Sequence, residues 1–571
     1  MGLTYQHLNP TSGGGSYLLR FPDAVRERTP CLLVDSGVGV DLDAALADDD
    51  YLAAALLTHA HLDHYATLAE SLRDGAPVYA AAATAAVLDD VLAEGEKNYD
   101  IGAVESVLDA VVPIDGWETV VSDVEVAPVP AGHAPAAAGF VVRFRDGSRT
   151  NHVLFTGDFT ARPVAGYPGL DADLPFDIDV LFANVSTAGD FEETLSEALF
   201  TVVERARAGS SVLVTASALT GVHVAYLLGH LGERVGASVP VRLVGQAAKL
   251  YADLGYDVPD VDAVPVFDSP GDVLDRDTVT VAGPEVPSAG SARRLFEAIE
   301  DDSAATLVQV TGGATDPVGT AGCTVYDYEV VNHPASGAVD ALVESLDPIH
   351  VVAGHGPDRE IRSFRGRYDE RFVWAGSDDR EQTLYGDGRW SPPPWLSEPA
   401  VKSIRARDWR SNGVRSGEAV TDGDGLPAVA RDGAVDLDAE GVEVGRFEAR
   451  FGDADEDATG AVAGEPDDAE RASAAESGAD DLAADSGSAR GASPPDADHP
   501  AVADAETFRS EVLGRLDALE STVGGDAYRA RVADAGGDVT LLRLLEEADL
   551  DHGEELTVVV AEPDGERSVD G

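Results

Sequence analysis

The sequence predicts a layered α/β protein in which one domain is interrupted by a second α/β unit. Residues 1–188 alternate short apolar strands with alanine-rich helices, and polar residues directly follow several of the strands. Residues 189–325 show a plainer alternation of helix and strand, and the first style returns at 326–375. We therefore expect the chain to leave its first domain and to return to it.

The strands of the first domain are the clearest elements of the pattern. Several of them are continuous apolar runs, which is typical of strands that are buried on both faces of a sheet. We predict them at 31–37, 51–60, 76–82, 124–133, 138–144, 152–158 and 180–186, and then at 326–332 and 349–356 with a helix between them at 336–346. The polar residues that follow these strands lie in loops, where the sites of layered α/β folds collect.

The inserted segment at 189–325 predicts a separate parallel α/β unit, since helices and strands alternate there with short connections. Helices are expected at 191–208, 221–235 and 247–256, with strands at 211–216 and 239–245.

The rest of the chain divides into three parts. Residues 376–449 form an extension rich in Arg, Trp and Pro, residues 450–502 read as a disordered acidic linker, and residues 503–571 as a small C-terminal module. In the module we expect an amphipathic helix at 504–523 and then a helix and a strand within 538–565. Such a module suits a homodimer or a docking contact in a processing complex.

The tryptophans and arginines between residues 374 and 410 allow two interpretations. The tryptophans and arginines are able to stack on and pair with single-stranded RNA, but we favour a hydrophobic arm packed on the first domain. The residues concerned are Trp374, Trp390, Trp395, Trp409, Arg405, Arg407 and Arg410.

The net charge of the chain is extreme. It has 104 acidic and 40 basic residues, a formal charge of −64, and its lysines are Lys97, Lys249 and Lys402 alone. So many like charges repel one another in dilute salt, whereas salt of about 1 M shortens the screening length to about 3 Å. The composition therefore indicates the salt-loaded cytoplasm of an extreme halophile. It does not exclude a nucleic acid as partner, because counterion release contributes little to binding in concentrated salt.

Other sequence features exclude several classes of protein. Cys31 and Cys323 have no metal-binding or redox spacing, so no disulfide framework is expected. The N-terminus lacks a basic region followed by an apolar stretch, and no run of about 18 apolar residues occurs. We expect a soluble cytoplasmic protein with no membrane partner.

A cluster of potential metal ligands follows the strand at 51–60. His59, His61, Asp63 and His64 stand within six positions on what reads as a loop. Imidazole and carboxylate are suitable ligands for zinc or manganese. A lone histidine is more often a core or surface residue with a satisfied hydrogen bond, but four such residues at this spacing favour metal binding.

This string resembles the HxHxDH signature of the metallo-β-lactamase superfamily, and the resemblance implies an αββα sandwich. It also implies further site residues. Asp35, at the end of the first predicted strand, matches an aspartate that supports the ligand loop. His133 matches a ligand that joins His59 and His61 on the first ion, and Asp158 matches the aspartate that bridges both ions.

The late part of the sequence resembles the β-CASP branch of that superfamily, which includes RNase J-like enzymes and the cleavage-and-polyadenylation nucleases. In that branch a cap domain follows the bridging aspartate, and a histidine, a helix and a final HG come after the cap. HPASGAVDALVESLDPIHVVAGHG has that order. The resemblance implies that His355 joins Asp63 and His64 on the second ion, and that His333 is the general acid and, with Ser336, contacts the substrate. The alternative for His333 is a helix-capping residue or one that orients a ligand.

The resemblance implies hydrolysis of a phosphodiester bond in single-stranded RNA, by endo- or exonucleolytic cleavage in RNA processing or decay. The expected cofactors are two divalent metal ions, zinc in the first place and manganese as the alternative. They would activate the attacking hydroxide, with Asp63, Asp158 and His333 as the catalytic residues.

Two departures from the nuclease pattern leave alternatives open. Asn184 stands where the branch has an acidic residue, and the segment VTASALTGVHVA lacks the arginine expected after the first strand of the cap. The alternatives are a non-catalytic subunit of an RNA-processing complex and a small-molecule esterase or lactonase of the same superfamily.

Overall fold

The computed structural model describes residues 1–313, 315–376, 379–408, 425–431, 433–452, 530–534 and 540–544. The chain divides into two units, Met1–Ala463 and Gly464–Gly571. In the second unit the structure describes an antiparallel hairpin of β22 (Ala530–Asp534) and β23 (Thr540–Leu544). The sequence predicts a helix that begins at residue 538, but residues 540–544 form strand β23, so this prediction is wrong there. The helix predicted at 504–523, and the acidic linker from residue 453 on, lie outside the described residues.

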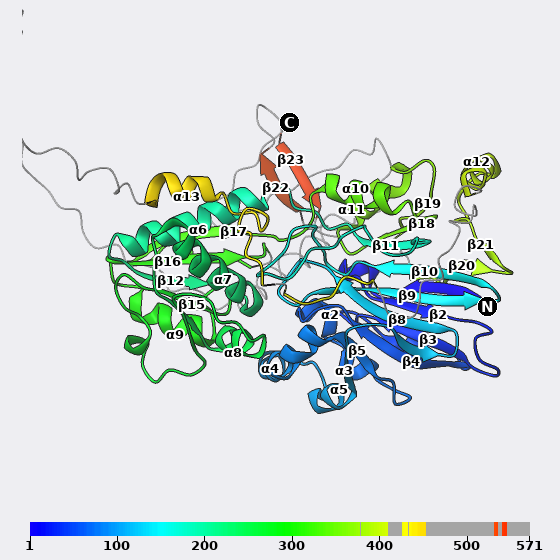
Figure 1. Cartoon of the computed structure of the whole chain (residues 1–571), viewed down its shortest axis with the longest axis horizontal. Coiled ribbons are helices and arrows are strands. Elements are labelled where there is room, and N and C mark those ends of the chain that lie inside the picture. The colour runs from blue at the N-terminus through cyan, green and yellow to red at the C-terminus, as the bar shows by residue number, and fades with distance from the viewer. Residues whose placement is uncertain are drawn as a thin grey trace, which may run out of the picture. The chain divides into compact units, whose positions relative to one another are not determined.

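Two mixed sheets face each other in the first unit (Figure 1). The first has the order β21 (Arg389–Trp390), β20 (Gln382–Gly386), β1 (Leu3–His7), β2 (Tyr17–Arg20), β3 (Thr29–Val34), β4 (Asp50–Leu57), β5 (Val78–Ala81), β6 (Val111–Ile114). The second has the order β19 (Phe372–Trp374), β18 (His350–Gly354), β11 (Val180–Asn184), β10 (Arg149–Phe155), β9 (Ala138–Asp146), β8 (Val124–Pro130), β7 (Glu118–Val121).

The inner strands of both sheets bury both of their faces, whereas the edge strands β6, β7 and β21 are partly exposed. In β3, Leu32 packs in the core between the sheets, whereas Leu33 packs in the core under the helices. In β10, Phe155 likewise packs in the core between the sheets and Leu154 in the core under the helices. Because successive side chains of a strand point to opposite faces, continuous apolar runs such as CLLV require two buried faces. This is the αββα sandwich that the sequence predicts.

Helices cover the outer faces of the sandwich. Helix α4 contributes Val87 and Leu88 to the core outside β5, and α10 contributes Val339 and Val343 outside β18. The helices and helical turns of this domain are α1 (Leu42–Ala45), α2 (Leu62–Tyr65), α3 (Leu68–Ser71), α4 (Ala82–Asn98), α5 (Val104–Ala110), α10 (Ser336–Leu346), α11 (Asp358–Ser363), η1 (Pro10–Ser12) and η3 (Phe364–Gly366).

The inserted unit, residues 191–329, is a parallel sheet with helices. Its sheet has the order β14 (Val261–Val264), β13 (Val241–Val244), β15 (Val279–Ala282), β12 (Ser211–Thr215), β16 (Ala305–Thr311), β17 (Thr324–Glu329). Every pairing in it is parallel. Its helices are α6 (Phe191–Arg207), α7 (Ala218–Val235), α8 (Gln246–Asp253), α9 (Gly290–Ile299) and the turn η2 (Pro270–Asp272).

The boundary predicted at residue 325 needs correction. Strand β17 pairs with β16 of the inserted sheet, so the chain returns to the sandwich after Glu329. An apolar strand pattern indicates burial but not which sheet the strand joins, and this explains the error.

The extension packs back on both parts of the first unit. Strand β20 pairs with β1, and Trp390 of β21 packs against Tyr385 in the core. Helix α12 (Glu398–Asp408) follows, and later α13 (Val444–Phe451) lays Phe447 and Phe451 against Phe200 of α6. These contacts are those of a packed arm.

The tryptophans of β19 and of the extension differ in exposure. Trp374 and Trp390 are buried, Trp395 is half-exposed, and Trp409 lies outside the described residues.

None of the helices that the structure describes is long and apolar enough to cross a membrane.

Candidate metal centre

The predicted ligands meet at one edge of the sandwich. Each of them follows the carboxyl end of a strand, β4, β8, β10 or β18, so loops that are distant in sequence converge there. These ligands are His59, His61, Asp63, His64, His133, Asp158 and His355, and His333, which follows β17, joins them.

Asp35 anchors the loop after β4. Its Oδ1 accepts a hydrogen bond from the Thr58 amide at 2.9 Å, and its Oδ2 accepts one from the Thr58 hydroxyl at 2.8 Å. The same Oδ2 lies 2.8 Å from Nδ1 of His64, which therefore carries the hydrogen and leaves Nε2 free to face the site. Asp35 thus contacts both Thr58, directly before His59, and His64.

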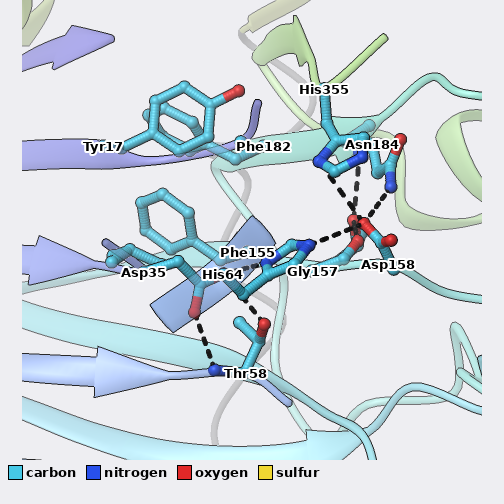
Figure 2. Close-up of a pocket in the computed structure, with 14 residues that line it drawn as sticks. Tyr17, Asp35, Thr58, His64, Phe155, Gly157, Asp158, Phe182, Asn184 and His355 are labelled. Carbon is cyan, nitrogen blue, oxygen red and sulfur yellow. Dashed lines mark hydrogen bonds and ion pairs between the residues drawn. The ribbon is translucent and has the colours of Figure 1, made fainter. Parts of the chain in front are cut away.

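Two buried imidazole nitrogens in the centre lack a hydrogen-bond partner within the described part of the chain. They are Nε2 of His64 and Nδ1 of His355. Each lies 3.6 Å from Oδ1 of Asp158, and Nε2 of His64 lies 3.7 Å from Oδ2 of Asp63. Figure 2 shows both rings pointing toward Asp158. Buried polar groups are rarely left unpaired, so these nitrogens suit a metal ion.

A second group of nitrogens has the spacing of ligands on one ion. Nδ1 of His61 lies 3.1 Å from Nε2 of His59 and 3.1 Å from Nε2 of His133. With Zn–N bonds of about 2.0–2.1 Å, the nitrogens of a tetrahedral site lie about 3.3 Å apart. The residues present therefore fit divalent metal ions.

The other ring nitrogens of this group are held from behind. Nδ1 of His59 lies 3.0 Å from the Thr58 hydroxyl, and Nδ1 of His133 lies 2.8 Å from the backbone oxygen of Asn332. Since both partners accept the hydrogen at Nδ1, the lone pairs at Nε2 face the site. Metal-binding histidines are commonly oriented in this way.

Asp158 lies between the two groups. Its Oδ2 is 3.6 Å from Nε2 of His133, while its Oδ1 faces His64 and His355. Asn184 donates a hydrogen bond from Nδ2 to Oδ1 of Asp158, and its own Oδ1 accepts one from the Ser186 amide at 2.8 Å. Asn184, which stands where the nuclease pattern has an acidic residue, therefore holds the Asp158 carboxylate through an uncharged amide.

His333 lies in the segment that returns from the inserted unit, three residues before the first residue of α10. Its Nε2 is 3.4 Å from Oδ2 of Asp158, and its Nδ1 is 2.9 Å from the Ser186 hydroxyl. The imidazole thus stands beside the central carboxylate and is held by a neutral hydroxyl.

The electrostatics of the site favour neutral imidazoles at His59 and His133 and protonated imidazoles at His64 and His333. Burial lowers the pKa of His59 well below its usual value and that of His133 to about 3. Burial also opposes protonation of His64 and His333, but the charge of Asp158 and the contact with it raise the pKa of both. The negative potential that holds a proton there also attracts a divalent cation.

Backbones approach closely around the site. A Cβ atom on Gly37 would lie 1.8 Å from the Asp63 backbone oxygen, and one on Gly354 would lie 1.6 Å from the Tyr17 hydroxyl. Glycine at these positions lets the ligand loops after β4 and β18 pack against their neighbours. Asp35 and His355 have φ angles of 55° and 51°, the left-handed backbone conformation that is uncommon for non-glycine residues.

Two residues near the centre were not singled out in the sequence. Asn332 contacts His133, and Arg162 donates to the amide oxygen of Asn332 at 3.0 Å. Their places in the chain, directly before His333 and four residues after Asp158, are the only signals that point to them.

Ser336, His223 and His230 are not members of the groups of possible metal ligands among the described residues. Ser336 is the first residue of α10, and its exposed hydroxyl accepts a hydrogen bond from Arg367 at 2.8 Å. His223 is buried against Glu440, and His230 contacts the Tyr226 ring.

The family model described as the metallo-beta-lactamase superfamily matches residues 16–198. This chain carries a metallo-beta-lactamase domain. The matched segment of the metallo-beta-lactamase domain contains the six candidate ligands from His59 to Asp158.

Two similar proteins accompany this match. The chain is 32% identical to Ribonuclease TTHA0252 of Thermus thermophilus over 224 residues, which is 36% of this chain and 50% of that protein. The chain thus spans about half the length of this curated relative. A crystal structure of a protein of unknown function from Enterococcus faecalis is similar with a TM-score of 0.46 and 13% identity, over 67% of this chain and 99% of that one.

Proposed function

We propose that this chain is a ribonuclease of the β-CASP type that hydrolyses phosphodiester bonds of single-stranded RNA. The observation that carries the proposal is the convergence of unpaired histidine nitrogens on Asp158, beside a histidine delivered by the inserted α/β unit. The metallo-beta-lactamase domain supports a metal-dependent hydrolase, and the similarity to a ribonuclease supports RNA as substrate.

We assign two divalent ions to the centre, with zinc first because imidazole predominates and manganese as the alternative. When bound, the ions would activate a water molecule and neutralise charge on the phosphoryl group. One ion takes His59, His61 and His133, the other takes Asp63, His64 and His355, and Asp158 faces both.

His333 is the proposed general acid. Its Nε2 is beside Asp158, whose charge favours the protonated imidazole, and its Nδ1 is held by Ser186. A positioned acid of this kind contributes about two to four orders of magnitude in rate. Ser336 is bonded to Arg367, so its assignment to the substrate stays a proposal without a supporting contact.

We place the enzyme in a cytoplasm of high ionic strength, on the basis of the net charge of −64. A homodimer or a processing complex formed through the C-terminal module remains part of the proposal. Most of that module lies outside the described residues.

Cleavage of end-labelled single-stranded RNA tests the proposal. The full chain is assayed in concentrated KCl with zinc or manganese, beside Asp63→Ala, His333→Ala and the exposed control Asp100→Ala. We expect wild type and Asp100→Ala to cut, Asp63→Ala to lose cleavage, and His333→Ala to lose about two to four orders of magnitude in rate while it retains its metal.

The contrary result is equally clear. If the metal-loaded wild type leaves single-stranded RNA and DNA intact, the nuclease assignment fails. Binding of RNA without cleavage would then favour the non-catalytic subunit, and hydrolysis of small esters or lactones would favour the small-molecule hydrolase.

A further inference from the structure

Asn332 and His133 hold each other by two hydrogen bonds. Nδ2 of Asn332 donates to the backbone oxygen of His133 at 2.6 Å, and Nδ1 of His133 donates to the backbone oxygen of Asn332 at 2.8 Å. The pair fixes both the backbone and the ring of His133. Because Nδ1 is occupied, Nε2 is directed toward His61 and Asp158.

Arg162 holds the other end of the Asn332 amide. Its Nη2 donates to Oδ1 of Asn332 at 3.0 Å, and its guanidinium carbon lies 4.3 Å from the centre of the Phe191 ring. Its Nη1 is also 3.6 Å from Oε1 of Glu192. Phe191 and Glu192 are the first residues of α6, where the inserted unit begins. Arg162 therefore touches both the start of the inserted unit and the segment that leaves it.

The two crossings between the sandwich and the inserted unit are also bonded to each other. The Ala188 amide donates to the backbone oxygen of Pro334 at 3.2 Å, and the Ser186 hydroxyl contacts His333. A shift of either crossing would thus be transmitted to Asn332, and from there to His133.

We propose that Asn332 is a positioning residue that couples the inserted unit to the ligand His133, so that metal affinity depends on the contact between Arg162 and Asn332. The inference rests on the proposed function only in taking His133 as a ligand. By thermodynamic linkage, metal binding in turn stabilises the two crossings.

Metal affinity measured on the full chain tests this inference without any assay of RNA cleavage. The metal-depleted protein is titrated with zinc against a chelator in concentrated KCl. The variants are Asn332→Asp, Arg162→Gln and the double variant, with Asn98→Asp on the surface as a matched control. Aspartate keeps the size of the side chain and its contact with Arg162 but is unable to donate to the backbone oxygen of His133.

We expect Asn332→Asp to weaken the binding of one zinc ion about 10- to 100-fold and to leave the other ion unchanged. Arg162→Gln changes no group in contact with His133, yet we expect it to weaken the binding of the same zinc ion. We also expect the double variant to bind no more weakly than Asn332→Asp, because Arg162 reaches His133 only through the Asn332 amide, whose bond to His133 is already lost in Asn332→Asp. Asn98→Asp should bind as wild type does.

Zinc affinities of Asn332→Asp and Arg162→Gln within about twofold of wild type would overturn the coupling. Arg162→Gln also keeps the test decisive if Asn332→Asp does not fold, since it leaves both bonds to His133 in place. Wild type that binds zinc but cleaves no RNA would count against the proposed function alone. Normal zinc binding by the variants beside an active wild type would count against the coupling alone.

Discussion

Nδ1 of His64 lies 2.8 Å from Oδ2 of Asp35, and this contact directs Nε2 of the same ring at Asp158. Asp35 accepts every hydrogen bond that it makes here, from the Thr58 amide, the Thr58 hydroxyl and His64. A carboxylate outside the metal site therefore selects the tautomer of a ring inside it.

Asp35→Asn should weaken zinc binding by the group of ligands that includes His64. Asparagine has one acceptor oxygen in place of two, so its amide nitrogen must face either the Thr58 amide or the pair formed by His64 and the Thr58 hydroxyl. Either orientation opposes a donor and weakens the contacts that orient the His64 ring. We expect about 10- to 100-fold weaker zinc binding by chelator competition. Asp50→Asn is the control, because Asp50 is also buried but pairs with Arg20 instead. Equal zinc affinities of the two variants would contradict this role of Asp35.

Glu440→Ala should destabilise the junction of the extension, α7 and the sandwich. The buried Glu440 carboxylate accepts hydrogen bonds from the amides of Ala165 at 2.7 Å and Gly166 at 2.9 Å, and it lies 2.9 Å from Nε2 of His223. Its removal leaves these groups unpaired, at a cost of about 2–4 kcal/mol in the free energy of unfolding measured in urea.

The exposed neighbour Glu443 provides the comparison for this substitution. Its side chain pairs loosely with Arg446 at 3.8 Å, so Glu443→Ala should change stability by less than about 0.5 kcal/mol. If both alanine variants unfold at the same urea concentration, Glu440 does not fasten the junction.

His350 should make stability depend on pH. Burial among aromatic rings lowers the pKa of His350 to about 3, whereas an unfolded histidine titrates near its usual value. As pH falls below about 6.5, the unfolded chain takes up this proton first, so stability is lost toward acid and is complete above that value. The His350 ring should therefore contribute part of the free energy of unfolding that wild type loses toward acid pH.

His350→Gln removes that contribution while it keeps an acceptor for the indole of Trp374, which donates to Nδ1 of His350 at 2.8 Å. Between about pH 7 and about pH 5 the variant should lose about 2 kcal/mol less free energy of unfolding than wild type. The histidines of the metal centre titrate in both proteins and cancel in the difference. Parallel pH dependences of the two proteins would contradict the assignment.

Salt should stabilise the whole chain. With a formal charge of −64, the folded state suffers repulsion that ions screen over about 10 Å at 0.1 M and about 3 Å at 1 M. We expect the urea concentration at half-unfolding to rise steadily with KCl. Sucrose of matched osmolarity is excluded from the protein surface but screens no charge, so it should raise the midpoint less than KCl does. An unchanged midpoint across the KCl series would show that repulsion is unimportant.

The sequence predicts much of the fold and of the centre because both depend on local patterns. Continuous apolar runs indicate the doubly buried strands, and His59 to His64, Asp158 and His355 directly follow such strands. Their convergence then follows from the sandwich in which these strands end at one edge. Strand β17 shows the limit, because its pattern does not reveal that its partner is β16.

The residues that hold the ligands are harder to predict, because their contacts join distant segments without a fixed spacing. Asn332 reaches His133 across 199 positions, and Glu440 reaches His223 across 217. The hairpin strand at Thr540–Leu544 illustrates a different difficulty, since its short apolar run fits a helix and a strand equally well.

The metal content of the zinc-loaded full chain tests the central claim most directly. After loading and desalting in concentrated KCl, elemental analysis should find about two equivalents of zinc per chain, and fewer in Asp158→Ala, which lacks the carboxylate that faces both groups. About one equivalent or less in wild type, or equal contents in wild type and Asp158→Ala, would contradict a two-metal centre built on Asp158.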